Sequence, residues 1–290
     1  MHKFLRAIGF SDITKKDLEM ILDEVITRPE IMKITKDSEG NEFAELSGSF
    51  AAHAGITVRG TYQEDDSFHM DYYYPYVFGT SITTNEQIDV EKHAEKESYA
   101  GVCDEVNLGV TLIFYIQNVA DYLAETNRHL SKIHYGAMLA GLSTEGKILC
   151  PVVERKKNDV PAIQKNDRHN QLIAQAREGD EDAIESLTLE DMDTYALLSQ
   201  RVMKEDIFSI VKSTFMPFGI ESDQYTVLGE IIDCVTMENK LTHEKLYGMK
   251  LLCNNIQFDV CINEKDLLGE PAIGRRFRGN VWMQGNLCLE

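Results

Sequence analysis

The stretch ITVRGTYQEDDSFHMDYYY, Ile56–Tyr74, reads as two short strands separated by a polar loop. Polar and apolar side chains alternate along Ile56–Tyr62 and return along Phe68–Tyr74, which is the period of a β-strand with two unlike faces. The intervening residues 63–67 include three carboxylates, which suits an exposed turn. The stretch therefore predicts a β-hairpin, and with it an antiparallel sheet in the N-terminal part of the chain.

Pairing Tyr62 with Phe68 across the loop gathers most of the apolar residues on one face of this hairpin. The opposite face then consists of three polar cross-strand pairs: Thr61 with His69, Arg59 with Asp71, and Thr57 with Tyr73. Opposite charges directly across two strands stabilise an antiparallel pair, so the expected register agrees on both faces.

The polar face carries residue types that also occur in active sites. His69 and Asp71 are two positions apart on one strand, where they could share a proton or hold a metal, and Arg59 could orient an anion. The simpler interpretation is an exposed ion pair that contributes roughly 0.2–1 kcal/mol. The pattern favours the simpler interpretation, and His69, Asp71 and Arg59 stand as candidate catalytic residues without a predicted metal.

Other elements of the N-terminal part follow from caps and periodicity. Thr14 and Asp17 resemble a capping box, and the helical stripe behind them should stop at Pro29. Three further elements are expected: a buried strand over Gly109–Gln117, a short helix over Asn118–Glu125, and a second hairpin in which Ser143–Gly146 turns between Ile133–Leu142 and Lys147–Val153.

The middle of the chain changes in character. Residues 155–169 are polar, contain a proline and lack periodicity, so they predict a linker or an exposed loop. Helical patterning returns at Gln171 and includes a stripe that runs from Ile207 to Phe215 and ends at Pro217. This part predicts two or three helices.

The last seventy residues return to strand patterning. Four strands are expected, with a short helical stretch near Lys265–Leu268 before the last of them: Tyr225–Val235, Lys245–Cys253, Ile256–Ile262 and Arg276–Gln284. This order resembles an oligonucleotide/oligosaccharide-binding (OB) barrel. The chain ends before a full fifth strand, so a partial barrel or an SH3-like sheet fits equally well.

The predicted fold class is therefore α+β, in three parts. Residues 1–157 form an antiparallel sheet with packed helices, residues 158–220 form a linker and a helical segment, and residues 221–290 form a small, OB-like β unit.

The segment GRRFRGNVWMQG, Gly274–Gly285, supplies a second candidate site. Strict alternation places Arg276, Arg278 and Trp282 on one strand face, where a cationic and aromatic surface could bind an anionic or aromatic ligand. A bulge at Gly279 would reverse the alternation and bury Trp282. A single tryptophan in the core is the simpler expectation.

The composition restricts the partners of the protein. The formal net charge is −19, and each of the three parts is net negative, so nucleic acid and anionic membranes are not expected as partners. No apolar run approaches the roughly 20 residues that span a bilayer. The six cysteines lie far apart with no C-x-x-C pair, which suggests reduced thiols in a cytoplasmic protein.

Sequence motifs do not name a reaction. The chain contains no phosphate-binding loop, dinucleotide-binding turn, nucleophile elbow or zinc-binding helix motif, and no cofactor is expected. The leading hypothesis is a non-catalytic binding or regulatory protein that contacts a protein or a small ligand. An enzyme with a site on the N-terminal sheet and a self-associating structural protein are the alternatives, and the oligomeric state stays open.

Three stretches carry a resemblance to a known family: MHKFLRAIGFSDI at the start, EDIFSIVKSTFMPFGIESDQYTVLGEI in the middle and NEKDLLGEPAIGRRFRGNVWMQG near the end. Together they resemble an uncharacterised family of clostridia and related Firmicutes, over the whole chain. The resemblance implies a bacterial cytoplasmic protein and supplies no activity, substrate or catalytic residue.

Overall fold

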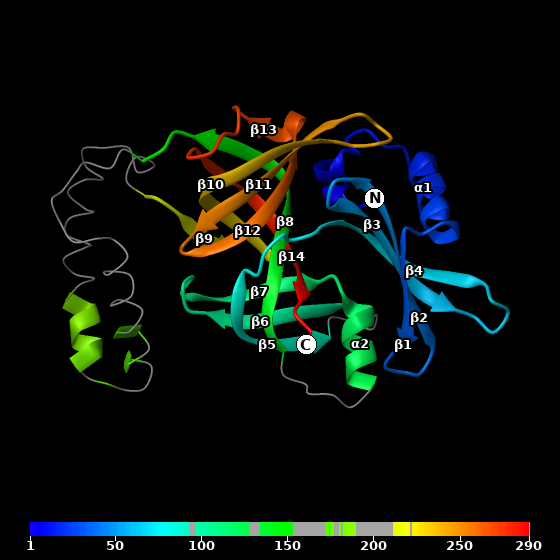
Figure 1. Cartoon of the computed structure of the whole chain (residues 1–290), viewed down its shortest axis with the longest axis horizontal. Coiled ribbons are helices and arrows are strands. Elements are labelled where there is room, and N and C mark those ends of the chain that lie inside the picture. Colours follow the sequence, from blue (N-terminus) through cyan, green and yellow to red (C-terminus); the bar gives the residue numbers. More distant parts are fainter. Residues whose placement is uncertain are drawn as a thin grey trace. The chain divides into compact units, whose positions relative to one another are not determined.

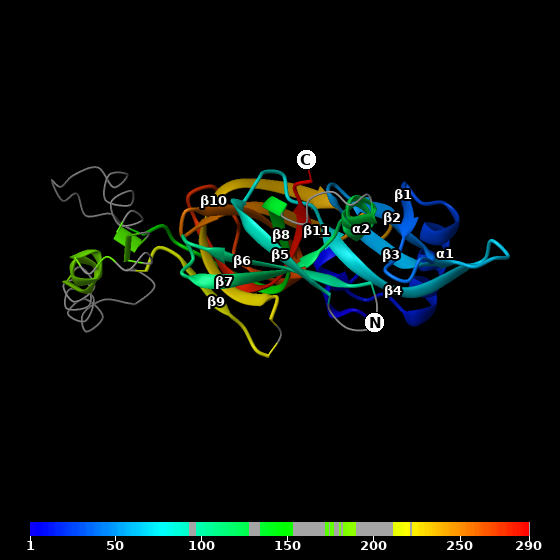
Figure 2. The same ribbon diagram turned by 90° about the horizontal axis from the view of Figure 1, so that it is seen from below.

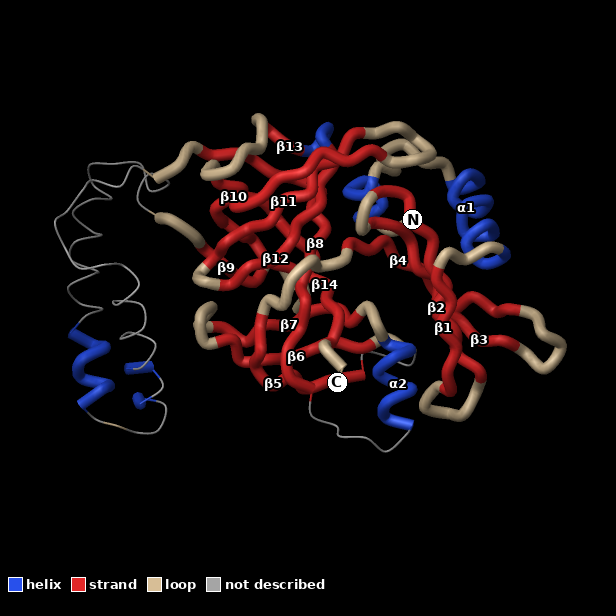
Figure 3. Tube along the Cα trace, viewed as in Figure 1, coloured by secondary structure: helices blue, strands red, loops and turns tan. Residues whose placement is uncertain are grey.

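The computed structural model describes residues 1–92, 97–127, 134–152, 172–173, 175–176, 180, 182–189, 211–220 and 222–289. The chain divides into two compact units. Residues 1–150 and 213–290 together form the first unit, and residues 151–212 form the second. In the second unit residues 182–189 are helical, with the Asp180 carboxylate accepting from the amide of Ala183 at the start of this helix. The first unit is mostly β structure with few helices (Figure 3).

A four-stranded antiparallel sheet opens the first unit, with strands in chain order (Figure 1). Its strands are β1 (Ile31–Lys36), β2 (Glu42–Ala51), β3 (Ala54–Tyr62) and β4 (Phe68–Val77). The predicted hairpin is confirmed as β3 and β4, and Tyr62 pairs with Phe68 as expected. Figure 2 shows its loop projecting away from the other strands.

Helix α1 (Lys15–Thr27) covers one face of this sheet. The predicted cap is confirmed, because the Thr14 hydroxyl accepts from the amide of Asp17 at 3.2 Å. Leu18, Leu22 and Val25 recur on one side of the helix and are buried with the inner side chains of β2 and β3. The apolar stripe seen in the sequence is thus the surface that holds the helix on the sheet.

The predicted register of the hairpin is correct only near its loop. Asp71 is an extra residue in β4, since Gly60 pairs with Met70 and Arg59 pairs with Tyr72. This bulge shifts all later pairs by one residue, so Thr57 pairs with Tyr74 instead of Tyr73. A one-residue shift exchanges the two faces of a strand. The face that carries Arg59 consequently receives tyrosines in place of Asp71.

The second sheet holds the remaining ten strands. They are β5 (Thr84–Lys92), β6 (Tyr99–Glu105), β7 (Val110–Ile116), β8 (His134–Leu149), β9 (Thr214–Pro217), β10 (Gln224–Glu238), β11 (Lys245–Cys253), β12 (Ile256–Asn263), β13 (Leu267–Leu268) and β14 (Arg276–Leu287). Helix α2 (Val119–Asn127) follows β7, and the 3₁₀ turn η2 (Glu264–Asp266) follows β12.

The pairings of this sheet close two rings that share the long pair β8–β14. One ring runs β10, β11, β12, β8, β14 and back to β10, with β12 and β8 parallel. The other runs β8, β5, β6, β7, β14, with β7 and β14 parallel. Inward side chains of both rings join one apolar core. Closure leaves few unpaired sheet edges in this part of the molecule.

The predicted turn at Ser143–Gly146 is wrong. These residues continue a single strand, β8, which pairs with β14 from Ala137 to Leu149. Thr144 is the extra residue of a bulge, and the Ser143 hydroxyl donates to the carbonyl of Asn280 at 2.8 Å. At Gly146 a Cβ atom would lie 2.4 Å from the Phe277 ring. The turn-like residues therefore accommodate a bulge and a close ring contact.

Strand predictions for the last part of the chain are confirmed at β10, β11, β12 and β14. Of the helical stretch expected near Lys265–Leu268, η2 takes up the first half, and Leu267–Leu268 form the short strand β13. β8 pairs with both β12 and β14, although it precedes these strands in the chain by more than sixty residues. Phe215 was expected in a helix and lies in β9, where it pairs with Val227 and packs into the core. The predicted helical stripe before Phe215, Ile207 included, falls outside the described residues up to residue 210.

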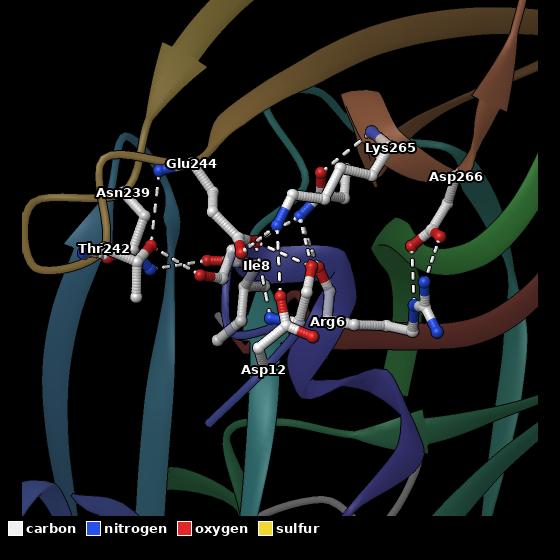
Figure 4. A network of polar contacts seen from close by, with 11 residues as sticks. Arg6, Ile8, Asp12, Asn239, Thr242, Glu244, Lys265 and Asp266 are labelled. Atoms are coloured by element: carbon white, nitrogen blue, oxygen red, sulfur yellow. Dashed lines mark hydrogen bonds and ion pairs between the residues drawn. The ribbon is translucent and has the colours of Figure 1, made fainter. Parts of the chain in front are cut away.

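Hydrogen bonds connect the N-terminal 3₁₀ helix η1 (Lys3–Ile8) and the residue after it to the β10–β11 loop (Figure 4). The Asn239 amide donates to the carbonyl of Ile8 at 2.7 Å, and the Thr242 hydroxyl donates to that of Gly9 at 2.6 Å. Gly9 has φ +93°, and a Cβ atom there would lie 2.6 Å from Asn239. Only glycine therefore lets the backbone approach this loop.

Glu244 is the centre of the same network (Figure 4). Its carboxylate accepts from the Ser11 hydroxyl at 2.8 Å, from the Asn263 amide at 2.6 Å and from Lys265 Nζ at 2.7 Å. Burial would raise the pKa of Glu244, but the hydrogen bonds from Lys265, Ser11 and Asn263 outweigh it and lower the pKa.

No helix among the described residues is long and apolar enough to cross a membrane.

We expect Glu244 to make stability depend on pH. A carboxyl group whose pKa is lower in the folded state than in the unfolded state stabilises the folded state at pH values above the unfolded-state pKa. This stabilisation is lost as the pH falls through the folded-state pKa. The Glu244→Gln variant should therefore be less stable than the parent chain at pH 7, with a difference that persists to about pH 4.5 and narrows below it, as the pH falls through the lowered pKa of Glu244. Urea unfolding at a series of pH values measures this difference.

Glu24→Gln is the matched control, because Glu24 is exposed on α1. It should follow the parent chain at every pH. Equal pH profiles for Glu244→Gln and the parent chain would show that the network does not stabilise the fold.

Candidate functional site

Two polar rows cross the four-stranded sheet on the face away from α1. In the first row Lys33, Glu45, Arg59 and Tyr72 are direct cross-strand neighbours on β1 to β4. The adjacent row consists of Ile31, Ser47, Thr57 and Tyr74. Charges of alternating sign therefore lie next to one another across three strands, which is a favourable arrangement on a sheet.

Arg59 is completely buried at the centre of the first row. Its Nε donates to Glu45 Oε1 at 2.7 Å. One terminal nitrogen donates to the Tyr72 and Tyr115 hydroxyls, and the other donates to the Tyr74 hydroxyl and to the carbonyls of Ile116 and Gln117. All five N–H donors of the guanidinium thus have acceptors, which is what a buried charge requires.

These contacts join the four-stranded sheet to the end of β7 and the start of α2. The carbonyls of Ile116 and Gln117 accept from Arg59 at 3.0 and 2.8 Å. The second oxygen of Glu45 accepts from the amide of Ala120, in the first turn of α2, at 2.9 Å. A carboxylate at a helix N-terminus is favoured by the helix dipole. The Arg59–Glu45 pair therefore holds the β7–α2 junction against the sheet.

The tyrosines around Arg59 act as neutral partners. Burial raises the pKa of Tyr74 and of Tyr115, although the Arg59 charge opposes this rise. Burial also disfavours the charge of Arg59, but the oxygens of Tyr115, Tyr72, Tyr74 and Glu45 keep its pKa well above the ordinary value. At neutral pH the cluster therefore holds a charged Arg59 guanidinium next to the protonated phenols of Tyr74 and Tyr115.

A cavity of about 330 Å³ lies beside this cluster. The second polar row forms one wall, and the β7–α2 junction and the ends of β8 and β14 form the others. The lining residues are Ile31, Lys33, Glu45, Ser47, Thr57, Tyr74, Phe78, Gln117, Asn118, Asp121, Met138, Asn286 and Leu287. Its volume falls at the lower end of the range for small-molecule sites.

Gln117 lies in the wall of this cavity with its amide group held in one orientation. Its amide nitrogen donates to the Val77 carbonyl at 2.9 Å and to Gln284 Oε1 at 2.8 Å. Both amide hydrogens are therefore engaged, which fixes the orientation of the group. Gln117 Oε1 is buried and has no hydrogen-bond partner among the described residues. A buried carbonyl without a donor costs roughly 1–3 kcal/mol, and this oxygen has essentially no surface that a molecule in the cavity could touch.

The candidate catalytic residues do not form one site. His69 and Asp71 lie near the hairpin loop, with His69 Nδ1 3.7 Å from the Asp71 carboxylate and 70% of the His69 side chain exposed. The expected exposed pair of Arg59 with Asp71 is wrong, because the bulge at Asp71 pairs Arg59 with Tyr72 instead. Arg59 is buried among tyrosines, and none of its hydrogen bonds reaches His69 or Asp71.

The second candidate site consists of Arg276, Arg278 and Trp282, of which two are buried and one is exposed. Strict alternation holds along β14, and no bulge occurs at Gly279. Trp282 is nonetheless buried, since η1 covers it, with Phe4 stacked on its ring and Asp223 accepting from its Nε1 at 2.7 Å. Arg276 is buried as well and donates to the carbonyl of Cys150. Arg278 is exposed and lines a separate hollow of about 460 Å³.

Sequence reasoning missed Glu45, Gln117 and the cavity. Glu45 lies in a strand whose burial is nearly continuous, and no local pattern distinguishes a buried carboxylate from an exposed one. Gln117 was the last residue of a predicted strand. Three consecutive tyrosines, Tyr72–Tyr74, were the one available signal, because a bulge next to them can direct two of their hydroxyls to one buried cation.

Comparisons with known proteins give one family. The model of the domain of unknown function DUF3881, described from an E. rectale gene, matches residues 5–285. Neither the curated proteins nor the solved structures include a match.

The Arg59→Met variant should lose about 3–5 kcal/mol of unfolding free energy, because it leaves Glu45 buried without its cation. Replacing Glu45 with Leu in the same chain should restore part of this loss. Guanidinium chloride unfolding of the single and double variants measures both effects.

Lys36→Met is the control for this experiment, since Lys36 is an exposed cation of the same sheet. Its effect should stay within about 0.5 kcal/mol. An Arg59→Met chain as stable as this control would contradict the assigned role of Arg59.

Proposed function

The chain belongs to the DUF3881 family, a domain of unknown function, and from this premise we propose that the protein binds a small molecule without transforming it. The ligand occupies the cavity beside the Arg59 cluster. The observation that carries the proposal is the 330 Å³ cavity itself, which combines apolar walls with the polar side chains of Ser47, Thr57 and Asn286.

Binding, in place of catalysis, is supported by how the polar groups of this site are engaged. Both oxygens of Glu45 accept hydrogen bonds, and every donor of Arg59 is used. The raised pKa of Tyr74 keeps its phenol protonated at neutral pH. A general base needs a free lone pair and a pKa near the working pH. These groups instead form a rigid wall, which suits recognition.

We also propose that the ring β10–β11–β12–β8–β14 is an OB-like barrel whose last strand, β8, precedes the others in the chain. Its support is the strand order together with the one parallel pair, β12–β8. OB proteins bind oligonucleotides or oligosaccharides across the second and third strands. In this ring the second and third strands are β11 and β12. Their outward side chains Leu246 and Cys261 pack beneath η1.

The covered OB-like face and the net charge of −19 both favour a ligand that is not nucleic acid. On the same electrostatic ground we propose that an anionic membrane is not a partner. The free cysteines support the further proposal of a cytoplasmic protein. Catalysis at His69 and Asp71, binding at Arg278 and self-association stay predictions from the sequence.

The cavity can be tested by blocking its mouth. Ile31 lines the cavity and is 45% exposed, so tryptophan at this position should fill the entrance without disturbing the core. The purified chain is incubated with a bacterial small-molecule extract and washed by ultrafiltration, and retained compounds are identified by mass spectrometry. The parent chain should retain at least one compound that the Ile31→Trp chain does not.

Met32→Trp is the matched control. Met32 is the next residue of the same strand, is 57% exposed and points to the opposite face, toward α1. It should retain what the parent chain retains. The proposed function is wrong if the parent chain retains nothing, or if Ile31→Trp retains the same compounds.

A further inference from the structure

His2 attaches the first three residues of the chain to the rest of the first unit. The centroid of its ring lies 4.9 Å from that of the Trp282 ring and 5.9 Å from that of the Phe4 ring. Its backbone amide donates to the Tyr73 hydroxyl at 3.2 Å. The chain has one tryptophan, so His2 lies against the only indole ring that the protein contains.

Residues 1–3 are the outer end of the N-terminal segment. Met1 and Lys3 are exposed, whereas Phe4 and the apolar residues of η1 after it are buried. Lys3 Nζ donates to Gln224 Oε1 at 3.0 Å. Segments with few buried apolar contacts open locally at a fraction of the free energy of global unfolding. This favours an opening that involves residues 1–3 and leaves the rest of η1 in the core.

The His2 ring fits its surroundings only when it is neutral. Its Nδ1 is buried and has no hydrogen-bond partner among the described residues. Both nitrogens of a protonated imidazole are donors, so protonation would leave an N–H at Nδ1 buried without an acceptor. A buried polar group without a partner is costly, and the cost is larger when the group carries a charge.

The charges near the ring also oppose its protonation. Lys3 and the α-amino group of Met1 are both cations that act on His2. Burial acts in the same direction, because it disfavours the charged form of an imidazole. Burial and these two cations together lower the pKa of His2 from 6.5 to about 4.

The other elements in contact with the ring offer it a hydroxyl and an indole. The hydroxyl is that of Tyr73 on β4, and the indole is that of Trp282 on β14. The carboxylate of Asp223 accepts from Nε1 of this indole at 2.7 Å. A protonated His2 would therefore have no ion pair among the contacts that the structure describes for it.

Proton binding is consequently coupled to the position of residues 1–3. After release His2 is surrounded by water, where its pKa is 6.5, against about 4 in the docked chain. The released state then binds more protons, so a falling pH favours release. Docking is fully favoured above pH 6.5 and weakens as the pH falls from 6.5 towards 4. By this relation the ratio of released to docked chains rises about thirtyfold between about pH 7.5 and about pH 5.

We propose that His2 is a pH-sensitive switch that holds residues 1–3 on Trp282 near neutral pH and releases them in acid. Protonation of the ring breaks its contact with the indole and opens the side of the indole that His2 covers. Phe4 and the remainder of η1 stay in the core before and after release. The switch is independent of the cavity beside Arg59 and of the function proposed for it.

Acrylamide quenching of the Trp282 fluorescence in the full chain measures the release. The quenching constant reports how readily acrylamide reaches the indole, so it separates release from quenching by the protonated His2 ring. We expect this constant to rise at least twofold between about pH 7.5 and about pH 5 in the parent chain. The His2→Phe chain keeps a ring against the indole and cannot be protonated there, so its constant should stay unchanged.

His69→Gln is the matched control, because the His69 side chain is 70% exposed on the β3–β4 hairpin. It should repeat the rise of the parent chain. The NMR signals of the His2 ring, identified by their loss in His2→Phe, give its titration directly. Their midpoint should lie below 6.5 and coincide with the rise in the quenching constant. The backbone amide signal of Ile8 should remain that of the folded chain.

Each of four results would contradict the switch. An equal rise in the His2→Phe chain would assign the release to other groups. A quenching constant of the parent chain that stays unchanged down to about pH 5 would show that residues 1–3 remain docked. A His2 midpoint at or above 6.5, as a cation–π attraction to the indole would give, would show that docking does not oppose protonation. Loss of the Ile8 signal together with exposure of Trp282 would show global unfolding in place of local release.

Discussion

One guanidinium with no access to water determines how the first unit is assembled. Arg59 lies on a strand of the four-stranded sheet, and its donors reach Glu45, three tyrosines and the backbone at the end of β7. Removing such a charge from water costs several kcal/mol, which only a complete set of acceptors offsets. The sheet, the β7–α2 junction and the tyrosines must therefore be in place together, and the cavity is the space left beside them.

The bulge at Asp71 makes this arrangement possible. Without it, Arg59 would face Asp71 on an open sheet surface, as strict alternation predicts from the sequence. One extra residue brings Tyr72 and Tyr74 to the face of Arg59, and Asp71 stays near the exposed His69. A single-residue irregularity thus changes an exposed ion pair into a buried cluster, and alternation rules cannot detect it because several positions accommodate a bulge equally.

Local features were predictable, and distant pairings were not. The Thr14 cap, the stripe on α1 and four strands of the last part follow from periodicity over a few residues. The course of β8 through Ser143–Gly146 depends on β14, more than 130 residues later in the chain, so turn-forming residues gave the wrong expectation. For the same reason the fifth strand of the β10–β14 ring could not be found near its partners in the sequence.

The buried state of Arg59 can be observed directly by the exchange of its guanidinium protons in solution. In ¹⁵N NMR spectra at neutral pH, the Nε–H and Nη–H signals of Arg59, identified by their loss in Arg59→Lys, should exchange with water far more slowly than those of the exposed Arg278. Slow exchange of both groups is the predicted result, because every donor is hydrogen-bonded and buried. Exchange as fast as that of Arg278 would contradict the organisation described for the sheet, the junction and the cavity.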